Sequence, residues 1–416
     1  MVAELVPEPP ATAPLDVCVI GMHYAPEHTG NAPYTTGMVA ALADAGHRVR
    51  VVTGYPHYPQ WRTAEGYGGL RRRERLDGVP VVRVRHPVPA VPDARRRVVM
   101  DAAFTLHAAT VGGPRPDVVV AVSPVLLSVL AGLRWRRPGR TALGVVTQDL
   151  YSRALRETGM ATGRWAELGG RLEGRLLGAA DGVAVVHDRF APTVAGLGVD
   201  PAKVTVIPNW VHLRAPTDRD RRATRRSLGW ADDETVVLHA GNMGVKQGLE
   251  NVVEAARRAG PGVRFVLLGD GGRRGALVAA ADGAGAGLQF LDPVDDAAFP
   301  DVLAAADVLL VNEAPTVAEM SAPSKLTSYF AAGRPVLAAT WPRSAAAAEL
   351  TRSGAGIRVD PGDPAALLDA AVALGADAGW RRELSTRGQA YARDHLGPRS
   401  AHDAYRAWVA RLAALR

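Results

Sequence analysis

The sequence predicts an α/β fold with two domains, each built on a mainly parallel β-sheet. A chain of 416 residues is too long for one hydrophobic core and suits two domains of ordinary size. Short apolar segments of strand length alternate with helix-length segments in two separate series, and a polar stretch at 214–226 divides them. Such alternation is typical of parallel sheets that carry helices on both faces.

The two series place the domains at 15–212 and 213–395, after a short disordered lead-in at 1–14. The final helical pattern, at 396–416, is expected to form a helix of its own, because its apolar residues recur at helical spacing. The strands expected in the first domain are 16–21, 48–53, 79–84, 117–122, 142–146, 181–186 and 203–208. Those expected in the second domain are 235–241, 263–272 with its glycine turn, 288–291, 306–311 and 334–339.

Composition favours a soluble cytoplasmic protein. Hydrophobic residues make up 47% and charged residues 22% of the chain, which is typical of a globular protein. No apolar run approaches the roughly 20 residues of a membrane-spanning helix, and the N-terminus lacks the pattern of a signal peptide. The single cysteine, Cys18, lies in an apolar strand and is expected to be a buried thiol in a reducing compartment.

The chain carries a net charge of +7, which is compatible with nucleic acid, an anionic membrane or phosphorylated ligands as partners. Arginine clusters occur at 71–73, 95–97 and 134–140, but no nucleic-acid module accompanies them. Solvated surface is the expected role of each cluster, and an acceptor-facing or membrane-facing patch is the alternative. We therefore expect no nucleic-acid partner, and reversible contact with an anionic membrane through 134–137 as an option.

Lysine is rare, since only Lys203, Lys246 and Lys325 occur among 49 basic residues. Arginine supplies most of the positive charge, so a retained lysine indicates a site that needs a compact ammonium group. Two of the three, Lys246 and Lys325, lie in the glycine-containing segments 240–249 and 322–336.

The loop after the first strand, 23–31, holds small polar residues and a glycine before a helix. Backbone N–H groups at such a position form an anion site, although a plain turn has the same composition. No GxGxxG motif follows this strand, which disfavours a nicotinamide-dependent dehydrogenase.

The loop after the first strand of the second domain, 240–249, is the stronger phosphate candidate. Gly241, Gly244 and Gly248 allow close backbone approach, and Lys246 adds a point charge suited to a diphosphate. The alternative is a lysine that extends along the surface at a helix start. A second glycine turn follows at 269–272.

The segment 322–336 carries the most specific pattern. Pro323 and Ser324 open a helix, Lys325 lies in its first turn and Gly333 ends it. A lysine at that end opposes the helix dipole at a cost of about 0.3–1 kcal/mol, so a bound anion explains its placement.

Taken in order, the segments HYAPEHTGNAPYT, TGYPHYPQW, VIPNWV, GNMGVKQGLENVVEAA, LLGDGG, APSKLTSYFAAGRPV and VDPGDPAAL resemble retaining glycosyltransferase family 4. The resemblance is greatest to the branch of colanic-acid-type exopolysaccharide enzymes. It implies the GT-B fold, in which two Rossmann-like domains face each other across a cleft and the C-terminal helix crosses back to the first domain. It also implies a hexosyltransferase (EC 2.4) that moves a sugar from a nucleotide diphosphate sugar to an acceptor hydroxyl with retention.

The resemblance assigns site residues on both domains. The predicted catalytic residues are Lys246, Lys325, Asp149 and Glu319. The predicted donor-binding residues are Gly30, Gly241, Asn242, Gln247, Gly269, Gly271, Phe290, Leu291, Met320, Ser321, Pro323, Ser324 and Ser328. His23, Thr29, Asn31 and Tyr34 are predicted on the acceptor side, where a sugar, a glycolipid or a small molecule would bind.

Three departures from the family pattern affect these assignments. The family often has an Arg and a Lys in the first donor loop, where this chain has Asn242, Lys246 and Gln247, so the division of the phosphate contacts among them stays open. The family often has two glutamates eight positions apart, where this chain has Met320 and Ser328, so Glu319 and Ser328 are the proposed substitutes. The family often has an acceptor-side histidine where this chain has Asp149, which a helix-capping role explains nearly as well.

Two other functions remain open at this stage, a sugar-nucleotide epimerase of the same fold and a non-catalytic nucleotide-sugar-binding protein. No cofactor is expected besides the co-substrate. No metal is expected either, because the phosphate-facing segments lack an Asp-x-Asp pair. Asp292, Asp295 and Asp296 are interpreted as a helix cap and solvated surface.

Overall fold

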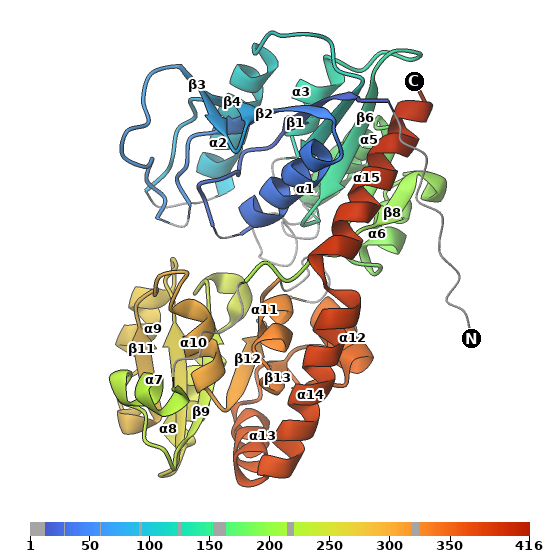
Figure 1. Ribbon diagram of the computed structural model, residues 1–416. Helices are drawn as coiled ribbons and strands as arrows, with labels where there is room; N and C mark the ends of the chain where they lie inside the picture. The colour runs from blue at the N-terminus through green and yellow to red at the C-terminus, as the bar shows by residue number, and fades with distance from the viewer. Residues whose placement is uncertain are drawn as a thin grey trace, which may run out of the picture.

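The structure is a computed structural model that describes residues 13–28, 30–58, 60–90, 94–123, 126–150, 152, 164–213, 220–317 and 324–416. The chain forms two lobes, with the N-terminal half in the upper lobe of Figure 1 and most of the C-terminal half in the lower one. Each lobe is an α/β domain around one sheet, so the predicted fold class is confirmed.

The first sheet has eight strands in the order β3-β4-β2-β1-β5-β6-β7-β8. The strands are β1 (Asp16–Ile20), β2 (Arg48–Gly54), β3 (Arg71–Leu76), β4 (Val79–Val84), β5 (Val118–Val122), β6 (Ala142–Thr147), β7 (Gly182–Val185) and β8 (Val204–Val206). Its helices are α1 (Ala32–Asp44), α2 (Ala94–Ala109), α3 (Ser128–Leu133), α5 (Arg164–Gly178), α6 (Phe190–Gly196) and the 3₁₀ turn η1 (Pro201–Lys203).

Both faces of this sheet are buried, as expected of strands rich in valine. Along β1, Cys18 and Ile20 face one core while Val17 and Val19 face the other, which is the two-residue period of a strand. Cys18 is a buried free thiol, so its predicted structural role is confirmed.

The edge strand β3 was not expected from the sequence. It pairs antiparallel with β4, whereas every other pairing in the sheet is parallel. Its sequence, RRRERL, lacks the apolar alternation that marks a strand, so the sequence pattern predicts surface at 71–73 and no strand. An edge strand buries little, and charged side chains there oppose pairing with other chains.

The second sheet has six parallel strands in the order β11-β10-β9-β12-β13-β14. The strands are β9 (Thr235–Ala240), β10 (Val263–Leu268), β11 (Leu288–Leu291), β12 (Val308–Asn312), β13 (Val336–Ala339) and β14 (Gly356–Val359). Its helices are α7 (Arg221–Ser227), α8 (Glu250–Arg258), α9 (Arg274–Ala280), α10 (Phe299–Ala305), α11 (Lys325–Ala331), α12 (Ala345–Ser353), α13 (Pro364–Ala376) and α14 (Ala378–His395), with 3₁₀ turns η2 (Val245–Gln247) and η3 (Gly285–Gly287).

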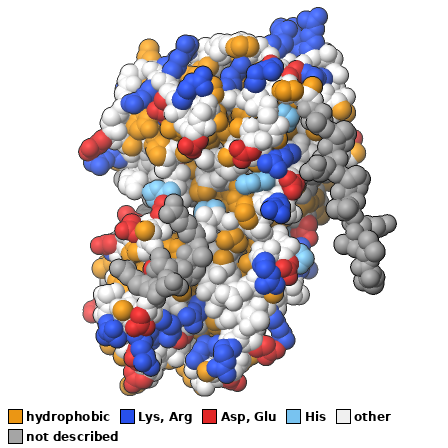
Figure 2. Space-filling model, in the orientation of Figure 1, with side chains coloured by type: hydrophobic (Ala, Val, Ile, Leu, Met, Phe, Trp, Pro, Cys, Tyr) orange, Lys and Arg blue, Asp and Glu red, His pale blue; other side chains and the backbone are white. Residues whose placement is uncertain are grey.

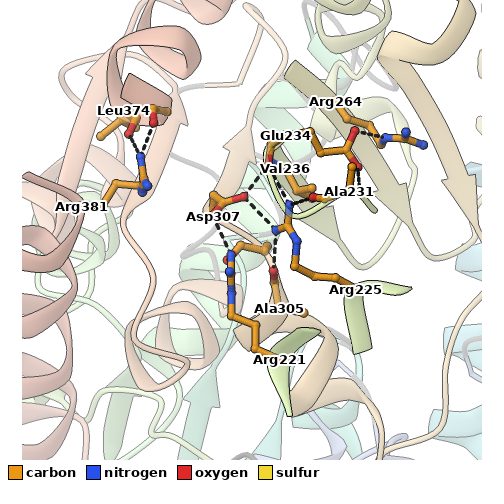
Figure 3. Close-up of polar contacts among 12 residues, drawn as sticks. Arg221, Arg225, Ala231, Glu234, Val236, Arg264, Ala305, Asp307, Leu374 and Arg381 are labelled. Carbon is orange, nitrogen blue, oxygen red and sulfur yellow. Dashed lines mark hydrogen bonds and ion pairs between the residues drawn. The ribbon is translucent and has the colours of Figure 1, made fainter. Parts of the chain in front are cut away.

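A buried polar network fixes α7 to this second domain (Figure 3). Asp307 accepts hydrogen bonds from Arg221 and Arg225 at 2.7 and 2.9 Å, and from the backbone N–H of Val236 at 2.9 Å. Arg225 is fully buried and also donates to the carbonyl of Glu234 at 2.7 Å. These bonds engage both terminal nitrogens of the buried Arg225 guanidinium, and they place α7 with the second sheet.

The last helix, α15 (Pro398–Ala414), returns to the first domain, as predicted for 396–416 (Figure 1). Trp408 lies against Gly144 of β6 and Gly182 of β7, where added Cβ atoms would come within 2.5 Å and 3.2 Å of its ring. Trp210 stacks edge-on against His402 with ring centroids 5.0 Å apart. The Trp408 ring can therefore pack this closely on the sheet because these two strand positions lack a Cβ atom.

The carboxyl edges of the two sheets face each other. Among the described residues, the polar contacts between the two lobes come from loops at these edges or from helices that follow them. Arg352 contacts Asp188 at 2.6 Å, Arg189 donates to the carbonyl of Arg343 at 3.2 Å, and His28 lies 3.8 Å from Asp296. Histidine side chains are visible along this waist in Figure 2. In parallel α/β domains, ligand sites form at this end of the strands.

Candidate active site

Two stacked glycine turns form the floor of the site on the second domain. Gly241 and Gly269 follow β9 and β10 with φ of 126° and 135°, values that favour glycine. A Cβ atom at Gly269 would lie 2.1 Å from the carbonyl oxygen of Gly241, and one at Gly271 would lie 2.6 Å from the Asn242 side chain. No larger residue fits, so backbone rather than side chain is presented at this edge.

Lys246 lies in the turn η2, whose conformation is fixed by contacts of Gln247 and Gly248. The Gln247 side chain accepts a hydrogen bond from the backbone N–H of Gly244 at 3.0 Å, so it stabilises the turn. Gly248 has φ of 53°, and a Cβ atom there would come within 2.7 Å of the Ala314 backbone. The ammonium group of Lys246 is thus carried on a rigid segment.

Asn312, at the end of β12, contributes to this rigidity and was not predicted. Its amide donates to the carbonyls of Gln247 and Gly248 at 2.7 and 3.0 Å, and it accepts from Asn251 at 2.9 Å. A polar residue that ends an apolar strand was the only sequence signal for this role.

Lys325 begins α11 and extends to the same floor. Its Nζ lies 3.3 Å from Nε2 of the buried His239, and a Cβ atom at Gly241 would lie 3.8 Å from it. Burial lowers the pKa of Lys325 to about 7, and the Glu313 carboxylate opposes this shift. Burial and the nearby Lys325 hold the pKa of His239 well below its ordinary value, so His239 is neutral. An anion placed here would favour the charged lysine.

The structure brings two predicted catalytic residues together across the domains. Asp149, after β6, lies with Oδ2 3.8 Å from Nζ of Lys246. Each side chain is about one-third exposed, at 36% and 32%. A solvated pair of this kind contributes only about 0.2–1 kcal/mol, so a ligand can displace it.

On the first domain, His23 and Glu27 form a hydrogen-bonded pair after β1. Nδ1 of His23 is 2.7 Å from Oε2 of Glu27, while Oε1 accepts from the backbone N–H groups of His57 and Tyr58 at 2.8 and 2.9 Å. Burial alone would raise the pKa of Glu27, but the bond and charge of His23 lower it to about 2. Glu27 therefore stays ionised and fixes both loops.

Aromatic and titratable groups surround this pair. Burial, with His23 and His86 nearby, lowers the pKa of His57 to about 3, so that imidazole is neutral. Burial raises the pKa of Asp101 on α2 to about 7, against the opposing charges of His23 and Arg97. Perturbed groups clustered at a sheet edge are typical of a functional site.

His23, Glu27 and His57 also form a candidate metal cluster, since their ligand atoms lie within 4.8 Å of one another. Two ligands on one tetrahedral zinc ion stand about 3.3 Å apart, given bonds of about 2.0–2.1 Å. The 2.7 Å between His23 and Glu27 is instead a hydrogen-bond distance, and the other Glu27 oxygen already accepts two backbone N–H groups. We interpret the group as a hydrogen-bonded cluster, and metal independence stays a prediction.

The other predicted residues lie in varied surroundings. Gly30 packs on the Tyr58 ring, and Asn31 donates to the carbonyl of Ser123 at 2.9 Å. Tyr34 is buried between Trp210 and His212, with ring centroids 5.1 Å from each, so it supports the domain junction and offers little surface to an acceptor.

On the second domain, Ser328 is buried within α11 and Ser324 is exposed at its start. Phe290 and Leu291 are half-buried at the end of β11, against separate cores. Asp295 caps the turn before α10 by accepting from Ala298 at 2.7 Å, as predicted. The predicted residues Thr29, Glu319, Met320, Ser321 and Pro323 lie outside the described residues.

Glu27, His57 and Tyr58 were not among the predicted site residues. All three fall in the segments 23–35 and 53–61, which carry the family resemblance. An acidic residue flanked by histidines in a strand-end loop was the available signal, but its partners lie 30 and 31 positions further along the chain.

Comparison with known proteins agrees with this architecture. Residues 29–210 match the family described as "Glycosyl transferase 4-like domain", and residues 234–377 match "Glycosyl transferases group 1". The chain is 32% identical over 337 residues to the "Putative colanic acid biosynthesis glycosyl transferase WcaI" of Escherichia coli, covering 77% of this chain and 82% of that protein. It is 31% identical over 187 residues to a D-inositol 3-phosphate glycosyltransferase of Mycobacterium tuberculosis, covering 42% of this chain and 39% of that protein.

Solved structures share the fold. Sucrose-phosphate synthase from Thermosynechococcus elongatus superposes with a TM-score of 0.73 at 20% identity, covering 96% of this chain and 99% of that one. Anabaena HepE in complex with UDP and glucose gives 0.70 at 17% identity, covering 95% and 99%. The chain therefore belongs to the glycosyltransferases with a glycosyl transferase 4-like domain followed by a group 1 domain, and it is a glycosyltransferase of the GT-B fold.

Proposed function

We propose that this glycosyltransferase moves a sugar from a nucleotide diphosphate sugar to an acceptor hydroxyl, with retention of configuration, in the biosynthesis of an envelope polysaccharide. One observation carries the donor assignment. Two of the chain's three lysines lie by the glycine turn that ends β9, Lys246 in the following turn η2 and Lys325 with its Nζ 3.8 Å from a Cβ atom placed on Gly241. A backbone floor with two ammonium groups suits a diphosphate.

The chemistry follows from where charge accumulates. As the bond between the sugar and the diphosphate breaks, negative charge develops on the departing phosphate oxygens. Lys325, whose pKa is lowered to about 7, gains a proton when an anion arrives and then stabilises the leaving group. Lys246 would exchange its contact with Asp149 for the donor. In this proposal no divalent metal is needed.

The acceptor class and the donor nucleotide are proposed from what the related proteins are named for or bind. WcaI is named for colanic acid biosynthesis, which supports a polysaccharide acceptor. HepE has been solved with UDP, with UDP-glucose, and with UDP and glucose, which supports a uridine diphosphate sugar as the first donor to test. Retention rests on the family resemblance, and proton NMR of the first-formed product would test it through the anomeric coupling constant.

A thermal-shift panel of nucleoside diphosphates and their sugars tests the donor directly. A ligand present at 100 times its Kd adds about 2.7 kcal/mol of stability. We expect one nucleotide sugar to raise Tm, and Lys325→Ala to abolish the rise without lowering the Tm of the free protein. A panel in which no nucleotide raises Tm would refute the donor assignment.

The location proposed for the enzyme is the cytoplasm, with reversible contact at the membrane. Within the described part of the chain, no helix combines the length and apolarity required to cross a bilayer. Exposed basic and apolar side chains occur together on α2, where Arg95, Arg96 and Arg97 precede the exposed Val98 and Val99. In the segment 134–137, by contrast, Arg136 is paired with Asp181 at 2.6 Å. We therefore place the proposed contact on α2.

A further inference from the structure

A histidine occupies a core position next to the glycine turn that ends β9. In the two-residue period of this strand, Val237 faces the core that also holds Leu267, and His239 takes the next place on the same face. Its side chain is fully buried. An imidazole at this position has a desolvation cost that an apolar residue avoids, so it requires a polar partner.

That partner is Lys325, whose Nζ lies 3.3 Å from Nε2 of His239. An ammonium group only donates hydrogen bonds, so Nε2 accepts and the ring carries its proton on Nδ1. Burial and then Lys325 keep the pKa of His239 well below its ordinary value, against the effect of the backbone at Asn242 and Leu310. In the part of the chain that the structure describes, Lys325 is the one side chain that hydrogen-bonds to this neutral ring.

Helix α11 brings the lysine to this position. Tyr329 is buried one turn after Lys325, and its hydroxyl oxygen accepts a hydrogen bond from the backbone N–H of Ala240 at 2.9 Å. Residues four positions apart lie on the same face of a helix, so this contact sets Lys325 over the end of β9. A Cβ atom at Gly241 would lie 3.8 Å from Nζ. The ammonium group therefore lies beside the glycine turn, and the bond to His239 orients it.

The two lysines of the site differ in the kind of group that they contact. Lys246 lies 3.8 Å from the carboxylate of Asp149, which competes with a diphosphate for its charge. His239 is neutral, so it orients Lys325 and leaves the positive charge uncompensated at this contact. A neutral acceptor thus fixes the direction of the ammonium group without weakening its attraction for an anion.

The titratable groups around Lys325 come from three elements. His239 lies on β9, Tyr329 lies on α11 itself, and Glu313 follows β12. Burial raises the pKa of Tyr329, so its hydroxyl stays neutral. Glu313 favours the charged lysine through its negative charge, and its carboxylate accepts a hydrogen bond from Thr340. Among the described residues, His239 alone of these groups is hydrogen-bonded to the ammonium group.

We propose that His239 is a positioning residue for the donor, because its Nε2 accepts a hydrogen bond from Lys325 and holds the charged ammonium group toward the diphosphate. A bond to the charged lysine stabilises that form, so His239 keeps more of the free enzyme ready to bind an anion near neutral pH. This role rests on the proposed function, since it requires that Lys325 meets the diphosphate. The competing explanation is a core histidine that only fills space.

Three variants separate positioning from packing. His239→Leu keeps most of the buried volume and removes the acceptor. His239→Gln places an amide oxygen near the position of Nε2, so it should restore the bond to Lys325. His239→Asn carries the same amide but ends near the position of Nδ1, so it is the matched control that does not reach the lysine.

Calorimetric titration from pH 5.5 to pH 9 measures the Kd of the tightest binder among UDP-glucose, GDP-mannose, ADP-glucose and dTDP-glucose, whose phosphates do not titrate in this range. Wild-type affinity should begin to fall near pH 7, where the pKa of Lys325 lies. In His239→Leu the fall should begin about one pH unit lower, because a hydrogen bond to a charged group is worth about one pKa unit or more. The affinity of that variant should therefore be about tenfold below wild type at pH 8 and within about twofold at pH 5.5.

The amide variants sharpen this test. At pH 8, His239→Gln should bind within about threefold of wild type, and His239→Asn should follow His239→Leu. The reverse order of these two variants would overturn the proposal. An unchanged pH dependence in His239→Leu would also overturn it, and so would an affinity loss that is equal at every pH, because packing alone would then explain the histidine.

Long-range proton–nitrogen NMR correlation of the imidazole gives a readout on the free wild-type protein that needs neither a nucleotide nor a variant. At pH 6 the ring proton should lie on Nδ1, with Nε2 unprotonated. A proton on Nε2 would overturn the inference, because that nitrogen could not accept from Lys325. If none of the four nucleotide sugars binds, or if Lys325→Met binds as tightly as wild type, the proposed function fails, and the NMR result still decides the bond between His239 and Lys325.

Discussion

The two facing sheet edges of this glycosyltransferase present different chemical groups to the site. On the second domain, glycine turns present backbone, and charge comes from Lys246 and Lys325. On the first domain, the site consists of side chains fixed by one another, with Glu27 binding groups from three positions of the chain. The difference indicates that one edge recognises a constant anionic group and the other provides geometry that can vary with the acceptor.

The largest expected effect is on stability and concerns the packing of α15 against the first domain. Trp408→Ala should lower the free energy of unfolding by about 3–5 kcal/mol, because it leaves a cavity against Gly144 and Gly182. Urea denaturation of the isolated variant measures this loss. Leu415→Ala on the exposed end of the same chain segment is the control and should change stability by less than about 0.5 kcal/mol. Equal stability of Trp408→Ala and wild type would show that α15 does not support the first domain.

The second prediction concerns pH and the donor edge. The pKa of Lys325 in the free protein is about 7, and a bound diphosphate should raise it. Below pH 7 the ammonium is already charged, so donor affinity should be constant. Above pH 7 each binding event takes up a proton, so affinity should fall towards tenfold per pH unit.

Calorimetric titration of the nucleotide sugar from pH 6 to pH 9 measures that slope. Lys325→Met should bind weakly and show no such dependence in this window. A wild-type affinity that is flat between pH 7 and pH 9 would mean that Lys325 does not meet the diphosphate.

Part of the fold and of the candidate site could be predicted from the sequence. Most strands of both domains and the glycine turns follow from local pattern and were predicted, whereas the short edge strand β14 was not. The edge strand β3 was not, because its arginines carry no apolar period. The pairing of Glu27 with the backbone at His57 was also missed, since contacts 30 residues apart leave no local signal. The burial of Tyr34 against Trp210 was missed for the same reason.

A third prediction tests the outer surface of the first domain. Vesicles that contain anionic lipid should bind the protein at low salt, with about 1 kcal/mol per basic residue near the surface. Arg95→Glu combined with Arg96→Glu should weaken co-sedimentation, and binding should decline as salt rises. The control pair Arg257→Glu and Arg258→Glu lies on α8 of the second domain. Failure of the wild type to bind at low salt would remove the membrane contact.

The smallest expected effect lies where the two edges meet. Asp149→Asn removes a carboxylate that competes for Lys246 at 3.8 Å, so donor affinity should rise about 1.5- to 5-fold. The measurement is the Kd of the nucleotide sugar at low ionic strength, with Asp188→Asn as a control at the other interdomain contact. Weaker donor binding in Asp149→Asn would mean that Asp149 itself contacts the donor.

The central claim is that Lys246 and Lys325 hold the donor diphosphate without a metal. Turnover of the identified nucleotide sugar in EDTA, compared across Lys246→Ala, Lys325→Ala and Lys203→Ala, tests it most directly. Lys203 donates to the carbonyls of Gly178 and Ala180 at 3.3 and 3.0 Å, away from the turns, so its variant should retain activity. The other two should each lose about 10²- to 10³-fold in kcat/KM. Full activity in both, or activity abolished by EDTA and restored by Mg²⁺ or Mn²⁺, would contradict the account.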